Sequence, residues 1–378
     1  MIQDFYAQNP LLFITLILLA FATIVQLIYY WVVYGKVAFF KQKNEFVRSD
    51  EPVSVIVCAR DEYYNLKENL PLLLQQDYSQ YEVVVVNHGS EDETQYLLRD
   101  LSDEYPNLKI VNLPQDLNFF TGKKFPLSIG IKSAKYDVLL FTDADCIPRS
   151  NQWVRRMAAN FTEGTDIVLG YGAYRKSNSL LNLLIRFDTT RIAMNYLGFA
   201  RIGMPYMGVG RNMAYRKSLF YSQNGFISHY RIQSGDDDLF INKAATAKNT
   251  RIEIQNDAHT ISVPKSSLSL WIRQKRRHLM TGGYYKPKHK FSLGLFAFTQ
   301  VFFWASAILL LVLWYLPYVV LGLIGIRLFS QLFVTGKVMQ KLSEKGFLPL
   351  VPFFELFLMI ISPLLALANA INKPIKWR

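Results

Sequence analysis

The hydrophobic positions of this chain form long blocks near its two ends and shorter runs in between. No charged residue occurs in residues 5–35, and the apolar stretch 11–34 is long enough to cross a bilayer. Residues 291–331 and residues 347–371 each contain a single charge. The pattern predicts one N-terminal and about three C-terminal transmembrane helices around a domain of soluble composition.

These blocks divide the chain into an N-terminal anchor at residues 1–35, a soluble domain at 36–290 and a membrane region at 291–378. The N-terminal block is expected to be retained, because it lacks a basic n-region, is longer than a signal-peptide core and has no small-x-small cleavage site. In the C-terminal region we expect helices at about 293–313, 317–333 and 347–370.

The charges beside the first block indicate its orientation. Only Asp4 precedes the block, and four basic residues follow it directly: Lys36, Lys41, Lys43 and Arg48. The positive-inside bias therefore predicts a cytoplasmic soluble domain on a multi-pass protein of the cell's inner (plasma) membrane.

The parity of the crossings creates a conflict at the C-terminus. The lysines of residues 337–345 indicate a loop that returns to the cytoplasm after the second C-terminal helix. A third crossing would then put Lys373, Lys376 and Arg378 outside, against the same bias. Either one C-terminal segment is re-entrant, or this end of the chain departs from the rule.

Within the soluble domain, short apolar runs alternate with stretches of helical spacing. The patterns predict strands at 53–59, 81–86, 109–113, 137–142 and 167–171, and helices at 62–76, 91–105, 125–134, 153–160 and 180–199. Ser90 is placed to cap the helix 91–105. The last helix is amphipathic and is expected on the core or at the membrane interface. Strands that alternate with helices predict an α/β fold with a parallel-rich sheet.

Polar residues collect where three of the predicted strands end. They are Arg60-Asp61-Glu62, Asn87-His88-Gly89-Ser90 and Asp143-Ala144-Asp145. Ligands of open α/β sheets bind at the carboxyl ends of the strands, so this coincidence is the main argument for a site. No Gly-x-Gly-x-x-Gly follows the first strand and no Walker loop occurs, which argues against dinucleotide-binding and P-loop folds.

The pair Asp143 and Asp145 is the first candidate for chemistry. Two carboxylates separated by one residue at a strand end can both approach a hard divalent cation, and Mg²⁺ or Mn²⁺ prefers such oxygen ligands. A metal there would offset the charge on a departing diphosphate. The alternative is a solvated acidic loop.

A second acidic cluster, Gly235-Asp236-Asp237-Asp238, opens a predicted helix. A carboxylate here can act as the general base that removes a proton from an acceptor hydroxyl, and like charges side by side raise at least one pKa. The alternative is ordinary capping of the helix N-terminus, although three carboxylates exceed what a cap requires.

Basic residues form the third candidate. Arg273-Gln274-Lys275-Arg276-Arg277-His278 lies shortly before the C-terminal membrane region, and guanidinium groups suit a diphosphate because they bind it through two donors. Its alternative is a basic stripe beside the membrane. Lys123 is a further candidate phosphate contact, and its alternative is a solvated loop lysine.

The net charge of +13 fits a domain held at an anionic membrane surface. A basic chain can also bind nucleic acid, but no recognised nucleic-acid motif occurs, so none is expected as a partner. The cysteines Cys58 and Cys146 lie in strand-like stretches and are expected to be buried free thiols of a reducing compartment.

In combination, order and spacing, these motifs resemble the inverting family 2 glycosyltransferases, in the membrane-bound branch that includes cellulose, chitin and hyaluronan synthases and ceramide glucosyltransferases. The resemblance covers about residues 53–283. It rests on the strand 53–59 with Arg60-Asp61-Glu62, Asn87-His88-Gly89-Ser90, Gly122-Lys123 with Leu127, Asp143-Ala144-Asp145, Gly210-Arg211-Asn212-Met213-Ala214-Tyr215, Gly235-Asp236-Asp237 and Gln274-x-x-Arg277-His278.

The resemblance implies a GT-A type fold that binds a nucleotide-sugar donor, and a single displacement with inversion that depends on Mg²⁺ or Mn²⁺. It assigns the base to Asp237, next to Asp236, and the metal to Asp145 and Asp143. The donor-binding residues that it implies are Ala59, Arg60, Glu62, Asn87, His88, Lys123, Asp143, Gln274, Arg277 and His278. A lipid or lipid-linked saccharide is the expected acceptor, because the site is expected against the bilayer.

The chain departs from the family pattern at two positions. His88 replaces the second Asp of Asp-Asp-x-Ser, which contacts the nucleobase in the family, so a uridine donor is left open. His278 replaces the Trp of Gln-x-x-Arg-Trp, which favours single transfer over a processive polysaccharide synthase. His88 and His278 leave room for a catalytically silent membrane scaffold. A nucleotidyl- or phosphotransferase could use the same metal site as the glycosyltransferase. A transporter is disfavoured, since Arg327 and Glu355 alone are charged within the predicted membrane helices.

Overall fold

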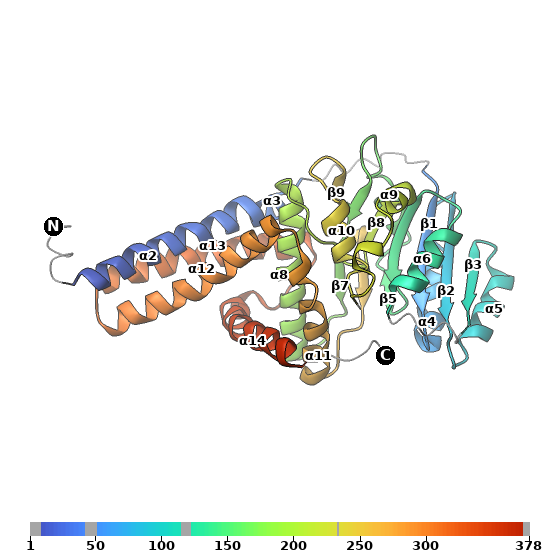
Figure 1. Cartoon of the computed structure of the whole chain (residues 1–378). Coiled ribbons are helices and arrows are strands. Elements are labelled where there is room, and N and C mark those ends of the chain that lie inside the picture. Colours follow the sequence, from blue (N-terminus) through green and yellow to red (C-terminus); the bar gives the residue numbers. More distant parts are fainter. Residues whose placement is uncertain (1–8, 42–50, 115–121, 233, 373–378) are drawn as a thin grey trace.

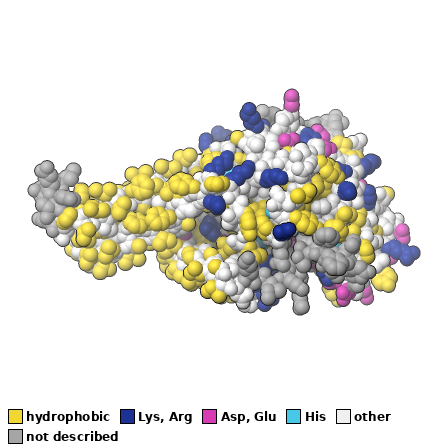
Figure 2. Space-filling view, viewed as in Figure 1, with side chains coloured by type: hydrophobic (Ala, Val, Ile, Leu, Met, Phe, Trp, Pro, Cys, Tyr) yellow, Lys and Arg dark blue, Asp and Glu magenta, His cyan; other side chains and the backbone are white. Residues whose placement is uncertain are grey.

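The structure, a computed structural model of the chain, describes residues 9–41, 51–114, 122–232 and 234–372. A sheet-containing domain carries a long helical bundle that projects from one side (Figure 1). Figure 2 shows hydrophobic side chains over the bundle, and lysine and arginine side chains gathered on the sheet-containing domain and beside the base of the bundle.

A seven-stranded sheet forms the centre of the domain. Its order is β3 (Leu108–Leu113), β2 (Tyr81–His88), β1 (Val53–Ala59), β4 (Val138–Asp143), β8 (Met213–Arg216), β6 (Ile167–Leu169) and β9 (Thr250–Ile252). The first four strands are mutually parallel, whereas β8 runs antiparallel to both of its neighbours. A small second sheet consists of β5 (Cys146–Pro148), β10 (Thr260–Ser262) and β7 (Gly172–Tyr174).

Both faces of the large sheet are covered, which explains the continuous apolar run of β1. Successive side chains of a strand point to opposite faces. Val55 and Val57 face a cluster formed with α4 (Tyr63–Leu74), α5 (Thr94–Glu104) and α7 (Trp153–Ala158), whereas Ile56 faces α6 (Lys124–Ser133). At Gly130 of α6 an added Cβ would lie 2.8 Å from Val86, so this helix lies closer to the sheet than any other residue would allow.

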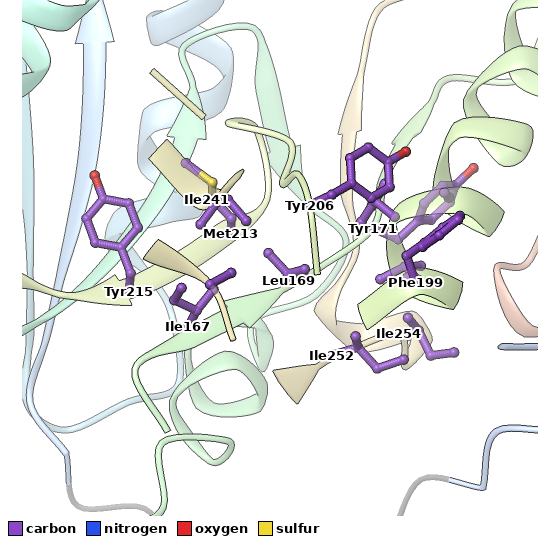
Figure 3. Packing of buried hydrophobic residues seen from close by; sticks show 14 of the residues in the cluster. Ile167, Leu169, Tyr171, Phe199, Tyr206, Met213, Tyr215, Ile241, Ile252 and Ile254 are labelled. Atoms are coloured by element: carbon purple, nitrogen blue, oxygen red, sulfur yellow. The ribbon is translucent and has the colours of Figure 1, made fainter. Parts of the chain in front are cut away.

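The cluster that contains Ile56 continues through the rest of the sheet, where aromatic and branched side chains pack against one another (Figure 3). It includes residues of α8 (Leu180–Arg201), α9 (Lys217–Ser222) and α10 (Asp238–Ala244). Short helical turns lie at η3 (Ile227–His229), η4 (Asn256–Ala258), η5 (Gly282–Tyr284) and η6 (Leu348–Leu350).

Four helical segments are long and apolar enough to cross a membrane: Pro10–Ala38, Pro287–Val312, Pro317–Lys341 and Leu348–Ile371. The first consists of α2 (Pro10–Ile28), a π-helical turn η1 (Tyr29–Tyr34) and α3 (Gly35–Ala38). The others contain α12 (Pro287–Val312), α13 (Pro317–Lys341) and α14 (Val351–Ile371). These helices agree with the predicted one N-terminal and three C-terminal candidates.

Helix α8 joins the sheet-containing domain to the base of the bundle. Gly198 permits this approach, because a Cβ there would lie 2.9 Å from the carbonyl oxygen of Val33. The hydroxyl of Tyr34 donates to Asn195 at 3.1 Å. Side chains of α2, η1, α12 and α13 belong to the same buried cluster as the sheet, so domain and bundle share one core.

Buried ion pairs fix the same junction. Lys275 of α11 (Leu268–Leu279) donates to Asp188 of α8 at 2.7 Å. The guanidinium group of Arg186 bonds Glu344, at the end of α13, at 2.5 Å, and both side chains are almost completely buried. Tyr171 also donates to Glu344, at 3.2 Å.

The structure differs from the sequence-based expectations in three respects. Ser90 does not cap α5: that helix begins at Thr94, and the Ser90 hydroxyl instead accepts the backbone N–H of Asp61 at 3.0 Å. Helix α13 continues to Lys341, two turns beyond the predicted end at residue 333, since its last turns pack on the domain. The strands β5, β7, β8, β9 and β10 were not predicted as strands.

We predict that Glu344→Gln destabilises the protein by about 3–5 kcal/mol, because it leaves the buried Arg186 charge without an anionic partner. The exposed pair of Arg155 and Asp77 provides the matched control, for which Asp77→Asn should cost about 0–1 kcal/mol. Urea unfolding in detergent, followed by tryptophan fluorescence, measures both. Equal losses would mean that the buried pair does not hold the junction.

Candidate active site

The predicted metal pair lies at the carboxyl end of the central strand β4. Asp143 is the last residue of β4 and pairs in register with Cys58 on β1. The side chain of Asn69 on α4 donates to the Ala144 carbonyl at 2.9 Å and so fixes the turn that carries Asp145. Local structure therefore directs both carboxylates to the edge where the sequence predicted a site.

The two carboxylates are close enough to share a cation. Ligand atoms of Asp143, Asp145 and Cys146 all lie within 4.8 Å of one another. Burial raises the pKa of the Cys146 thiol well above its usual range, and a protonated thiol is a poor metal ligand. Oxygen ligands suit Mg²⁺ or Mn²⁺, so the residues fit the predicted metal through the two carboxylates.

The ammonium group of Lys123, next to the N-terminus of α6, already contacts the Asp143 carboxylate. Burial alone would lower the pKa of Lys123, but the charges of Asp143 and Asp236 outweigh it and raise that pKa. Burial likewise opposes ionisation of Asp143, yet Lys123 lowers the pKa of this carboxyl. The Lys123 side chain is therefore a cationic partner of Asp143 within the protein.

Among the described residues, no basic side chain forms an ion pair with the other carboxyl groups at this edge, Asp145 and Glu62. Burial, together with the charge of Asp143, raises the pKa of Asp145. Burial also raises the pKa of Glu62, at the start of α4, and the charges of Asp145 and Asp143 add to this effect. Burial is the larger cause in both groups, and a divalent cation beside Asp145 and Glu62 would favour their charged forms.

Two loops that follow β1 and β2 are tied together beside the metal pair. The left-handed Asp61 (φ 54°) accepts the N–H of Glu91 at 2.7 Å, in addition to its bond with Ser90. Ala59 ends β1, and Arg60 follows it. The residues predicted to bind the donor on these loops therefore lie side by side and form one wall of the candidate site.

Asn87 and His88 end strand β2 and are both buried. The amide of Asn87 donates to Asn112 on β3 at 3.1 Å. Burial, aided by the nearby Arg60, lowers the pKa of His88, which keeps its ring neutral. Its Nδ1 is buried without a hydrogen-bond partner among the described residues, so the ring offers a free polar atom in this wall.

The acidic cluster resolves into separate roles. Asp237 is the N-cap of α10: one carboxylate oxygen accepts the N–H of Asp238 at 2.7 Å and the other accepts the N–H of Gly210 at 2.8 Å. Asp238 is buried and accepts hydrogen bonds from Thr281 and from Tyr285. Asp237 therefore caps α10, and this role does not prevent it from acting as a base.

Burial raises the pKa of Asp237 to about 8, and the charges of Asp236 and Asp238 contribute. Asp237 is linked to the metal pair by the segment Gly210–Arg211, because the Arg211 carbonyl accepts the hydroxyl of Thr142, one residue before Asp143, at 3.1 Å. A carboxyl group with a pKa near neutral pH, beside a metal pair, has the properties of a general base.

Lys124 is a site-forming residue that the sequence did not reveal. The residue is 4% exposed, and its ammonium group donates to the carbonyls of His229, Ile232 and Ser234, just before the acidic cluster. One end of α6 is thereby joined to Asp143 through Lys123, and to the loop before Asp236 through Lys124. Sequence alone offers no signal for this, because the partners are backbone carbonyls distant along the chain.

Helix α11 presents the predicted basic motif on several faces. The amide of Gln274 donates to the Tyr174 hydroxyl at 3.4 Å. Burial lowers the pKa of Arg277, whereas Tyr174 and Asp143 favour its charge. Desolvation of the ring and the charges of Lys275 and Arg277 lower the pKa of His278, although the residue as a whole is exposed. Arg277 and His278 thus lie close enough to Asp143 for their charges to interact, and Gln274 lies beside Tyr174.

Arg211 is a second residue that was not among the predicted donor contacts. Its guanidinium group lies over the Tyr174 ring at 4.2 Å and donates to Ser262 at 3.1 Å, while its Nε is buried without a partner among the described residues. Its charge also acts on Asp143 and Asp145. The adjacent Asn212, in contrast, is completely buried and is used for packing between the two sheets.

We predict that Asp145→Asn weakens Mn²⁺ binding at least about 10-fold. Mutating residues that only hydrogen-bond to metal ligands already lowers metal affinity by about 10-fold or more, and Asp145 is expected to be a ligand itself. Electron paramagnetic resonance of free Mn²⁺, with a nucleoside diphosphate present, measures the affinity. Asp103→Asn, an exposed carboxylate on α5, is the control and should bind as the unaltered protein does. Equal affinities for both variants would exclude Asp145 as a ligand.

The chain was compared with known protein families. The profile of glycosyl transferase family 2 matches residues 54–222, and the profile of glycosyl transferase family group 2 matches residues 139–368. The latter match covers more than half of the chain. Together the two matches include the metal pair, the acidic cluster and the motif on α11.

Curated relatives match in part. Glycosyltransferase AglE of Haloferax volcanii is 29% identical over 192 residues, which are 49% of this chain and 58% of AglE. Poly-beta-1,6-N-acetyl-D-glucosamine synthase of Staphylococcus epidermidis is 28% identical over 127 residues, 31% of this chain and 30% of the synthase. The chain therefore spans less than two thirds of the length of these relatives.

Among solved structures, the mannosyltransferase PcManGT from Pyrobaculum calidifontis, in complex with GDP-Man and Mn²⁺, has a TM-score of 0.57 at 20% identity. The superposition covers 87% of this chain and 96% of PcManGT. It confirms the predicted GT-A type fold. Since the profile of family group 2 covers more than half of the chain, and includes most of the three C-terminal membrane candidates, the chain belongs to the family 2 glycosyltransferases, in glycosyl transferase family group 2.

Proposed function

We propose that this protein transfers a sugar from a nucleotide-sugar donor to a lipid or lipid-linked saccharide, by a metal-dependent displacement with inversion. One observation carries the proposal: the metal pair and the high-pKa Asp237 flank the same segment, Gly210–Arg211. A sugar held there would meet a diphosphate site on one side and a base on the other.

The donor diphosphate would be held between Asp143, Asp145 and the cations around them. Mg²⁺ or Mn²⁺ bound by the two carboxylates would neutralise charge on the departing nucleoside diphosphate. The contact of Lys123 with Asp143 supports a cation at this position. Arg277 and Arg211 supply further positive charge, and guanidinium groups bind phosphate oxygens through paired donors.

The chemical step would be a single displacement at the anomeric carbon. A hydroxyl oxygen of the acceptor bonds to that carbon as the bond to the donor phosphate breaks, and the hydroxyl proton passes to Asp237. Burial favours this role, because it raises the pKa of Asp237, and the charges of Asp236 and Asp238 add to the effect. Both oxygens of Asp237 accept backbone N–H groups, which fixes the orientation of the carboxylate.

The wall formed by Ala59, Arg60, Asn87 and His88 is proposed to bind the nucleoside. Its buried, unpartnered His88 Nδ1 supports a hydrogen bond to the base or ribose. Glu62 lies at the same edge, close to the metal pair. Since imidazole replaces the family's carboxylate at position 88, we leave the identity of the nucleobase to the experiment below.

A membrane acceptor is supported by the position of α8 and α11. Helix α11 carries the basic motif and is tied to α8, which packs on the base of the bundle. We place the catalytic domain in the cytoplasm at the plasma membrane, because of the basic residues after the first helix. Single transfer is favoured over processive synthesis by His278, which offers no indole platform for a growing chain.

The first test measures nucleoside diphosphate release from a panel of nucleotide sugars by the protein in detergent, with Mn²⁺ or Mg²⁺. We expect one donor to be hydrolysed slowly without acceptor, and Asp237→Asn to reduce release by about 10²–10⁴-fold, the usual contribution of a general base. Asp145→Asn should also reduce release, and Asp103→Asn should not. Absence of both turnover and donor binding would favour the silent scaffold; a product that retains phosphate would favour a nucleotidyltransferase.

The pKa of Asp237 predicts the pH dependence of the reaction. Because the base must be ionised, kcat/KM should rise with pH and level off above an apparent pKa near 8. Asp236→Asn removes a neighbouring negative charge, so the inflection should move to lower pH. A pH–rate profile of the donor hydrolysis measures both. An inflection that stays in place, or moves upward, would show that another group controls the rate.

A further inference from the structure

Helix α14 has the length and composition of a membrane span, yet both of its ends contact the side of the molecule that carries the catalytic domain. At its N-terminal end, Phe354 packs on Phe187 of α8 with ring centroids 5.7 Å apart. Val351 belongs to the same buried cluster, which also contains residues of α8 and α11. The helix therefore begins at the junction of domain and bundle.

The C-terminal end of α14 is held by α11. The guanidinium group of Arg276 donates to the Asn369 side chain at 2.8 Å, and also to the carbonyls of Ala368 and Asn372. The Asn369 amide in turn donates to the Arg276 carbonyl at 2.7 Å. Between the two ends, Phe357 stacks on Trp271 of α11 at 6.5 Å. The helix thus follows the catalytic domain along its length.

The outer half of the bundle has a core of its own, without α14. The buried cluster there contains residues of α2, α12, the following turn and α13, and no described residue of α14 belongs to it. With 21 residues, α14 is ~31 Å long, so a crossing helix would reach that half. Figure 1 shows α14 beside α11 and α8, away from the tip of the bundle.

The polar contacts of α14 agree with this position. Its one acidic residue, Glu355, accepts from Arg327 of α13 at 2.6 Å and from Tyr30 of η1 at 3.0 Å, so its charge faces the bundle. The opposite face is apolar and exposed along the whole helix, through Phe353, Ile360, Leu364, Leu367 and Ile371. This face continues the hydrophobic surface of the bundle, which the hydrocarbon of a membrane leaflet would cover.

We propose that α14 stays within the membrane leaflet next to the catalytic domain, with its apolar face in lipid, and does not cross the bilayer. The described chain then crosses three times, through α2, α12 and α13, and α14 ends on the side of the catalytic domain. Lys373, Lys376 and Arg378 follow on that side, in agreement with the positive-inside bias. With three crossings, the parity of the membrane helices no longer conflicts with the positive-inside bias at the C-terminus.

The inference can be tested without knowing the donor or acceptor. Single cysteines are introduced as Asn372→Cys at the end of α14, Trp314→Cys at the outer turn of the bundle and Asp103→Cys on the catalytic domain; all three positions are exposed. The native thiols are buried. A membrane-impermeant maleimide is applied to intact and to permeabilised cells. We expect Asn372→Cys to label with the same permeability requirement as Asp103→Cys, and Trp314→Cys with the opposite one.

Labelling of Asn372→Cys together with Trp314→Cys would overturn the proposal. If lipid shields position 372 in both preparations, a protease-cleavable tag after Arg378 gives the same decision, because it is cut from one side only. A separate test concerns the hydrogen bonds of Arg276 to the end of α14. Asn372→Cys should label faster in combination with Arg276→Ala, which removes these bonds, than with Arg273→Ala, which alters an exposed arginine of the same helix. Equal rates would show that Arg276 does not hold the end of α14.

Discussion

The crowding of carboxylates at one edge of the sheet is the constraint on which the rest of the site depends. Asp143 and Asp145 lie on one side, and Asp236, Asp237 and Asp238 on the other. Like charges brought together out of water repel strongly unless cations or hydrogen-bond donors accompany them. Lys123 contacts the first group, Lys124 fixes the loop that carries the second, and Thr281 and Tyr285 donate to Asp238. A divalent cation between Asp143 and Asp145 would further offset this repulsion.

The sequence predicted the elements whose patterns are local. The runs that became β1 to β4, the helices between them and the four membrane candidates were all recognisable from hydrophobic spacing. The strands β5, β7, β9 and β10 have three residues each, and their partners lie far along the chain, so no local pattern indicates them. Strand β8 pairs antiparallel with two parallel strands, which a regular alternation of strands and helices does not predict.

The candidate site divides in the same way. Asp143, Asp145 and Asp237 were found because acidic motifs followed a strand or opened a helix. Arg211 and Lys124 were missed, since their roles depend on contacts with Tyr174 and with the carbonyls of residues 229–234, which only the folded chain brings near. Residue type also gave no means of separating the roles of Arg273, Lys275, Arg276 and Arg277, because the faces of α11 are set by its neighbours α8 and α14.

The core that the sheet shares with the bundle has a consequence for biosynthesis. Phe296, Val334, Val338 and Leu342 complete the cluster that begins on the sheet, and the ribosome makes them after the whole catalytic domain. Until these residues have been inserted, the cluster lacks its side chains from α12 and α13, although η1, which is made first, contacts α8. Final packing of the sheet-containing domain therefore follows the insertion of α12 and α13. The membrane helices thus belong to the folding unit of this domain and are more than an anchor attached to it.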